Sequence, residues 1–343
     1  TLSSFIALLI LATTVDSRYR CKGINGKQVD WFVAYKLPTA VLNANGGKNF
    51  VYADSDNPEW QLSRKTIDEE DSAIGSTVSQ AYGNDSSSFV LMYSDDGPAT
   101  PVDSYRGHAK GVLVFDGSTG FWLVHSVPNF PGLTSYIYPP TGFKFAQSFL
   151  CVSVATDNLA AIGEQLMFVQ ATPFKSQLPE KFATKFPVLR TVLAKRSLPQ
   201  SATVFSSTKH IQTEGGTAFH AYAKHKKYQK DLWHDLVALD MGVSLGVQTW
   251  PKRRRRRSPL ELQERWHQCV RRHRPDDHGR QLLLEQGPLQ VGSQRCSKAA
   301  GCVRRRSEST EVAALARRRR TVPGARGHLA HVPRHGARRG GVH

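Results

Sequence analysis

Residues 111–126 read GVLVFDGSTGFWLVHS, which is two apolar runs separated by a short polar segment. Val, Leu, Phe and Trp dominate both runs, and runs of this length and composition are typical of β-strands. The segment from Asp116 to Gly120 contains the Asp and Gly residues that favour a tight turn. The stretch therefore predicts a β-hairpin.

Further short apolar runs on both sides of this stretch indicate more strands. QVDWFVAYKLP, residues 28–38, alternates so that Val29, Trp31, Val33 and Tyr35 would share one face before Pro38 ends the run. SFVLMYSDD at residues 88–96 and SLGVQTW at residues 244–250 are apolar runs of the same kind. We therefore expect an α+β fold that is rich in sheet.

Helical signals are fewer, and the clearest lies in KDLWHDLVALDMG, residues 230–242. Leu232, Leu236 and Leu239 would share one face of a helix, and Gly242 can end it.

The net charge of +18 comes almost entirely from the last part of the chain. Residues 251–343 contain 24 Lys and Arg against 7 Asp and Glu, whereas residues 1–250 contain 22 against 21. This tail also lacks Ile, Phe and Tyr, so it has little from which to build a core, and we expect it to be disordered or only locally helical. A natural basic arm, a low-complexity tail and a stretch translated in a shifted frame all fit this composition, and the absence of any repeat favours the shifted frame.

The N-terminal segment LSSFIALLILATTVDS has an uninterrupted apolar run from Phe5 to Ala12. A run of this length falls far short of the ~20 residues that a membrane-spanning helix needs. It instead predicts a secretory signal peptide over residues 1–17, with a buried N-terminal strand as the alternative. The chain opens with Thr1 and not Met, so we expect the start of the signal peptide to be missing.

Secretion determines how the cysteines are interpreted. Cys21 and Cys151 are the two cysteines of residues 1–250, and in an oxidising compartment they are expected to form a disulfide. Asn84 begins an Asn-Asp-Ser glycosylation sequon in a Ser-rich segment. The cysteines and histidines of the tail lack zinc-site spacing, so we expect no metal site and no cofactor.

The most informative polar residues are His108 and Lys110 in the segment GHAKG. On a strand, residues two apart point to the same face, so both side chains could meet one phosphate group. An imidazole can attack phosphorus or protonate a leaving oxygen, and an ammonium offsets charge on the other oxygens. Gly107 and Gly111 would let the backbone approach a ligand. The alternative is a solvated pair, as we expect for the same spacing in KHKKY, residues 224–228.

Four motifs, VDWFVAYKLP, RGHAKGVLVFD, GFWLVHSVPNFP and SFLCVSV, together resemble the deoxyribonuclease II family of acid endonucleases over residues 21–250. The resemblance implies phospholipase D-like half-domains in a pseudo-dimer, and metal-independent cleavage of DNA through a phosphohistidine to 3′-phosphate and 5′-hydroxyl ends. It implies catalytic roles for His108, Lys110 and His125, and a Cys21–Cys151 disulfide. It also implies a lysosomal or secreted protein, with residues 18–250 as the catalytic region. An ordinary histidine pKa near ~6.5 allows one neutral and one protonated histidine at mildly acidic pH, which fits this chemistry.

The chain departs from the family in one respect: residues 251–343 contain no second H-x-K triplet. Two hypotheses fit this departure. A two-fold homodimer could pair two copies of His108 and Lys110. Alternatively, the chain is a secreted or lysosomal homologue that binds DNA without cutting it, with the arginine runs of the tail contacting phosphates.

Overall fold

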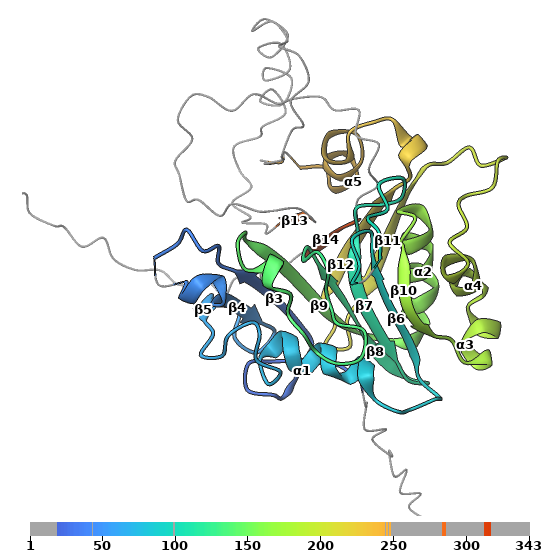
Figure 1. Cartoon of the computed structure of the whole chain (residues 1–343). Coiled ribbons are helices and arrows are strands. Elements are labelled where there is room, and N and C mark those ends of the chain that lie inside the picture. Colours follow the sequence, from blue (N-terminus) through green and yellow to red (C-terminus); the bar gives the residue numbers. More distant parts are fainter. Residues whose placement is uncertain are drawn as a thin grey trace, which may run out of the picture.

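The computed structural model describes residues 19–243 apart from Asn43 and Ala99, residues 245 and 247, and two short strands in residues 283–285 and 312–316 (Figure 1). The expected signal peptide and most of the SLGVQTW run lie outside the described residues.

The centre of the fold is an eight-stranded antiparallel sheet with the order β10-β6-β7-β8-β9-β3-β4-β5. Its strands are β3 (Trp31–Lys36), β4 (Phe50–Asp54), β5 (Gln61–Leu62), β6 (Phe89–Ser94), β7 (Lys110–Phe115), β8 (Thr119–His125), β9 (Gln147–Ala155) and β10 (Pro173–Gln177). Two smaller sheets hold β1 (Cys21–Lys22) with β2 (Gln28–Val29), and β11 (Ser206–Gln212) with β12 (Ala218–Lys224), β14 (Val312–Ala316) and β13 (Leu283–Glu285). The sheet-rich α+β expectation is confirmed.

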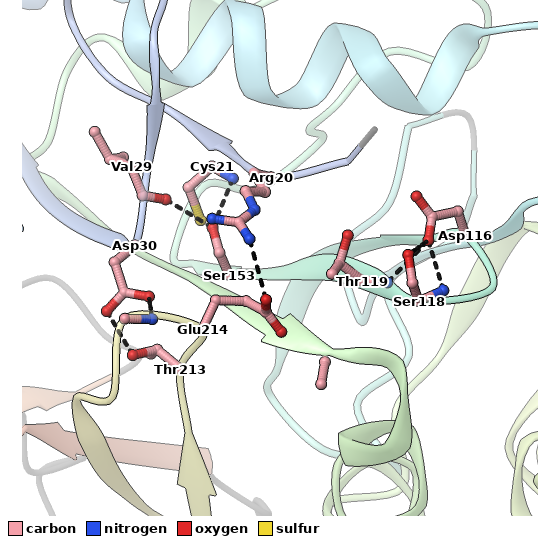
Figure 2. A network of polar contacts seen from close by, with 12 residues as sticks. Arg20, Cys21, Val29, Asp30, Asp116, Ser118, Thr119, Ser153, Thr213 and Glu214 are labelled. Atoms are coloured by element: carbon pink, nitrogen blue, oxygen red, sulfur yellow. Dashed lines mark hydrogen bonds and ion pairs between the residues drawn. The ribbon is translucent and has the colours of Figure 1, made fainter. Parts of the chain in front are cut away.

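The hairpin predicted from residues 111–126 is the β7–β8 pair, in which Lys110 pairs with His125 and Phe115 with Gly120. The Asp116 carboxylate accepts hydrogen bonds from the Ser118 and Thr119 backbone N–H groups at 2.7 and 2.8 Å, and so closes the turn (Figure 2). Asp116 therefore has a structural role.

Both faces of the large sheet are covered. On one face lie α2 (Leu159–Phe168), α3 (Glu180–Lys185), α4 (Pro187–Leu193) and the β11–β12 pair. On the other face lie α1 (Ala73–Ser79), β1, β2 and the connection from β8 to β9. Adjacent residues of β8 therefore enter different cores, with Trp122 in the first and Phe121 in the second. This explains why β7 and β8 read as continuous apolar runs.

The run at residues 28–38 is not a single strand. Val29 belongs to β2, which pairs with β1, whereas Trp31 begins β3 in the large sheet. Val29 packs in the same core as Phe32, while Trp31 and Val33 pack against the other core. The predicted common face of Val29 and Trp31 is therefore wrong, because the chain changes sheets between them.

The helix predicted at residues 230–242 begins as a π-helix over Trp233–Val237 and continues as α5 (Ala238–Met241). Gly242 ends it in the left-handed conformation, at φ 65°, as predicted. The predicted common face is wrong, because Leu232 is buried and Leu239 is exposed. A π-helix has more residues per turn than an α-helix, which rotates Leu239 away from Leu232.

Short 3₁₀ helices complete the secondary structure at Asn45–Gly47, Gln80–Tyr82, Pro140–Gly142, Thr156–Asn158 and Lys226–Tyr228. Two strands, β13 and β14, lie in the Arg-rich tail, where the composition predicted none, and β14 pairs with β12. Within the described residues, no helix has both the length and the apolar character needed to cross a membrane.

The turn of the β11–β12 hairpin is fastened to the large sheet by polar contacts (Figure 2). The Asp30 carboxylate accepts from the Thr213 hydroxyl and from the Gly215 N–H at 2.6 Å. Glu214 forms an ion pair with Arg20 at 3.0 Å, and its N–H donates to the Ser153 carbonyl. These contacts hold the hairpin against the end of the sheet where β7 ends and β8 begins.

The predicted disulfide between Cys21 and Cys151 is present, and it links β1 to β9 across 130 residues of sequence. Both cysteines are fully buried. The bond therefore ties the N-terminal segment into the second core.

Replacing both Cys21 and Cys151 with Ala should lower the free energy of unfolding by about 2–5 kcal/mol, because the denatured chain loses a long closed loop. Urea denaturation with and without reductant measures this. Reductant should destabilise the native chain and leave the double variant unchanged, whereas equal stability of the two proteins without reductant would contradict a structural role for the bond.

Candidate functional site

Three strand ends meet at one edge of the large sheet. β6 ends at Ser94, β7 begins at Lys110 and β8 ends at His125. The antiparallel register pairs Ser94 with Lys110, and Lys110 with His125, so these residues form one row across the sheet. The chain leaves β6 and returns to β7 at this edge, which lies at the top of the sheet in Figure 1.

His108 and Lys110 are brought together by Asp95, the first residue after β6. One carboxylate oxygen, Oδ2, lies 2.6 Å from His108 Nδ1, and the other, Oδ1, lies 2.5 Å from Lys110 Nζ. The sequence predicted that the two basic side chains would meet because they share a strand face. That reason is wrong, since His108 precedes β7 and lies in the connecting segment.

The three side chains differ sharply in burial. The side chains of Lys110 and Asp95 are 3% and 7% exposed, and that of His108 is 54% exposed. Burial by itself would raise the pKa of Asp95, but the hydrogen bond from His108 and the charge of Lys110 outweigh it and lower the pKa below its ordinary value. Asp95 therefore stays ionised at mildly acidic pH, and it compensates the charge of the buried ammonium.

The contact with Asp95 also sets the chemistry of His108. A carboxylate can only accept, so the ring nitrogen that faces it, Nδ1, carries a proton and donates. The other ring nitrogen, Nε2, belongs to a side chain that is 54% exposed. A neutral His108 would present a lone pair there, and a protonated one an N–H group.

His125 lies behind this cluster and not within it. Its side chain is buried, and the ring packs against Phe130 and Phe149 with centroids 5.1 and 6.1 Å away. Its Nδ1 accepts from the Val127 N–H at 3.2 Å, so the proton of the neutral ring is on Nε2. Burial, followed by the charge of Lys110, lowers the pKa of His125 to about 3. His125 is therefore neutral at mildly acidic pH and cannot touch a substrate in this conformation.

We expected the glycines beside His108 to let the backbone approach a ligand, but their surroundings give them other roles. A Cβ on Gly111 would lie 2.4 Å from the Tyr93 hydroxyl and 2.6 Å from the Leu123 carbonyl oxygen. Gly111 is thus required by close packing inside the sheet. Gly107 is buried, and its N–H donates to the Gln170 carbonyl at 3.4 Å.

The second H-x-K triplet of the sequence, His225 and Lys227, is not the solvated pair that we expected. His225 is only 2% exposed, its Nε2 lies 2.9 Å from the Ser197 hydroxyl, and its Nδ1 accepts from the Lys227 N–H. Burial, together with Lys226 and Lys227, lowers the pKa of His225 to about 4. This histidine caps the turn after β12, and it offers no ring nitrogen to a substrate.

The remaining histidines of the described region have ordinary partners. His210 and His220 face each other across the β11–β12 pair with ring centroids 4.2 Å apart. His234 is exposed and pairs with the neighbouring Asp235 at 2.7 Å. Within residues 19–243, no three His, Cys, Asp or Glu side chains form a group that could hold a metal ion.

Sequence reasoning missed Asp95, although one signal pointed to it. The acidic pair Asp95 and Asp96 directly follows the apolar run of β6, and a charged residue at a strand end of a buried sheet needs a partner. Asn84, the expected glycosylation site, lies exposed in the loop before β6.

The chain is similar to known proteins over most of its length. The family model described as deoxyribonuclease II matches residues 20–273, which extends past the change of composition at Trp250. The chain is 48% identical over 242 residues to cell-death-related nuclease 7 of Caenorhabditis elegans, covering 70% of this chain and 66% of that protein. It is 36% identical over 244 residues to deoxyribonuclease-2-alpha of Rattus norvegicus, covering 67% and 68%.

The match to the nematode nuclease spans just under two thirds of that protein's length. The family model nevertheless covers well over half of the 343 residues, and its matched region contains the Asp95, His108 and Lys110 cluster. The chain belongs to the deoxyribonuclease II family.

Proposed function

We propose that this chain provides the catalytic site of an endonuclease that hydrolyses phosphodiester bonds of DNA at acid pH without a metal ion. The observation that supports it best is the exposed imidazole of His108, oriented by Asp95 beside the Lys110 ammonium. The names of the relatives, which are nucleases and deoxyribonucleases, point the same way.

In the first step, the lone pair of a neutral His108 Nε2 attacks phosphorus and forms a phosphorus–nitrogen bond. The bond from phosphorus to the 5′ oxygen breaks, and this oxygen takes a proton to become a 5′-hydroxyl. Asp95 stabilises the positive charge that develops on the imidazole, and the nearby Lys110 ammonium opposes negative charge at the phosphoryl oxygens.

In the second step, a water oxygen attacks the phosphohistidine. The phosphorus–nitrogen bond breaks, the electron pair returns to His108 Nε2, and the water releases a proton. The products are a 3′-phosphate and a 5′-hydroxyl end, and His108 is restored.

The proton for the 5′ oxygen requires a second acid. The described residues contain two H-x-K triplets, and His225 of the second is buried and bonded through both ring nitrogens. We therefore propose a phospholipase D-like arrangement in which two half-sites face one cleft. The second half-site would come from residues outside the described region or from another copy of the chain.

An acidic compartment suits this chemistry, and we propose that the protein acts in lysosomes or after secretion. The lowered pKa of Asp95 supports this, because the carboxylate that orients His108 stays ionised there. A predicted signal peptide would direct the chain to either place, and exposed Asn84 would be available for glycosylation.

The competing function is binding of DNA without cleavage, and the absence of an H-x-K triplet from residues 251–343 favours it. Incubating the full chain with plasmid DNA at pH 5 and excess chelator separates the two. A nuclease yields fragments that end in 3′-phosphate, whereas a binding protein leaves the DNA intact and retards it on a gel.

His108→Ala should reduce cleavage at pH 5 by at least about 10³-fold, because it removes the nucleophile. His234→Ala is the matched control, since His234 is also exposed and paired with a carboxylate. The control should keep the native rate. Cleavage by the His108→Ala protein at more than a tenth of the native rate would contradict the assignment.

Asp95→Asn keeps the shape of the side chain and removes its charge, and it should lower kcat by about 10²- to 10⁴-fold. The pH dependence of kcat should also change, because the variant has no carboxylate that becomes protonated at low pH. Asp235→Asn, in the control pair with His234, should change neither. An unchanged pH profile in an Asp95→Asn protein with lowered kcat would indicate a merely structural role.

His125 should make the fold less stable as the pH falls. Its pKa is about 3 in the folded chain, against about 6.5 when unfolded, so below pH 6.5 only the unfolded chain takes up the proton. The loss should reach about 2 kcal/mol at pH 5 and end near the folded pKa. The free energy of unfolding can be measured by urea denaturation between pH 7 and pH 4. It should depend less on pH in His125→Gln than in the native protein, whereas the exposed-site control His234→Gln should keep the native pH dependence. If the free energy of unfolding changes with pH equally in the His125→Gln and native proteins, this prediction is wrong.

A further inference from the structure

Both ends of the segment Asp103–His108 contact Asp95 of the candidate site. The Asp103 N–H donates to the Asp95 carbonyl at 2.7 Å, and the His108 ring contacts the Asp95 carboxylate at 2.6 Å. A short segment with both ends attached to Asp95 must stay close to it.

Hydrogen bonds also hold the middle of this segment. The Asp103 carboxylate accepts from the N–H groups of Tyr105 and Arg106 at 3.1 and 3.2 Å. The Arg106 guanidinium donates to the carbonyls of Lys195 at 2.8 Å and Ala171 at 3.0 Å. The backbone on both sides of Tyr105 is therefore fastened to other parts of the molecule.

Tyr105 itself is 81% exposed, so this fastened backbone presents an aromatic ring to solvent. An exposed single aromatic residue needs no explanation in general. Here it lies three residues before His108, which limits the separation of the two Cα atoms to about 11 Å. Nucleotides along one strand of duplex DNA rise by about 3.4 Å each, so a base one to three nucleotides from the reacting phosphate is within reach.

We propose that Tyr105 is a stacking platform for a nucleobase that flanks the phosphate held at His108. Every base has an aromatic face, so a bare tyrosine ring binds bases without sequence preference. A base inside a duplex is already stacked on its neighbours, so the ring would select DNA that is single-stranded or locally opened. This proposal rests on the proposed function, which places the phosphate at His108.

Binding can be measured independently of cleavage in a His108→Ala background. Fluorescence anisotropy with a labelled 12-nucleotide single strand at pH 5 gives the Kd. Adding Tyr105→Ala should raise this Kd by about 5- to 100-fold, and Tyr105→Phe, which keeps the ring, should leave it within about twofold. Val102→Ala, an exposed apolar residue one position before Asp103, is the control and should have no effect.

Cleavage then tests the position of the base. With His108 intact, Tyr105→Ala should raise KM for the single strand about as much as it raises Kd and change kcat by less than about twofold. The same test uses a single strand with an abasic residue beside a unique cleavable linkage. The native protein should bind this strand more weakly than the intact strand, whereas the Tyr105→Ala protein should bind the two strands equally, because the two changes remove the same contact.

The outcomes separate the two proposals. If the native chain does not cut DNA but its binding depends on Tyr105, the stacking site stands and the proposed nuclease activity falls. If the chain cuts DNA and Tyr105→Ala changes neither Kd nor KM, the stacking site is wrong and the nuclease activity stands. Absence of binding to the single strand, or loss of binding with Tyr105→Phe as large as with Tyr105→Ala, also overturns the stacking site.

Discussion

The inner strands of the large sheet are covered on both faces by other elements, and their charged side chains lie at the ends of the strands. This constraint explains the position of the candidate site. Lys110 begins β7, Asp95 follows β6 directly, and His108 lies just outside the sheet. A buried ammonium is tolerated there because a carboxylate lies 2.5 Å away, and the same carboxylate orients an imidazole that faces outward.

The same constraint separates the histidines by role. His125 and His225 are enclosed by protein, and burial keeps both neutral over the pH range in which an ordinary histidine becomes charged. His108 remains accessible and keeps one nitrogen for chemistry. Burial, more than sequence spacing, therefore distinguishes the histidine that could react from those that stabilise the fold.

Some features could be read from sequence because they depend on neighbouring residues. The β7–β8 hairpin follows from two strand-forming runs around an Asp-containing turn, and the end of α5 follows from a glycine that adopts a positive φ. The predictions failed where the chain changes sheets after Val29, and where a π-helix rotates Leu239 into solvent. Local pattern does not reveal which distant strand or core will be the partner.

The sequence by itself determined the strand-rich pattern, the pairing of Cys21 with Cys151 and the family, through short motifs whose residues act over a few positions. It also singled out His108 and Lys110. Only the tertiary structure decided that Asp95 joins them, that His125 is enclosed by Phe130 and Phe149, and that His225 is buried against Ser197. Those facts depend on burial and on contacts between separate elements, and both arise only when the sheet and its covering layers are assembled.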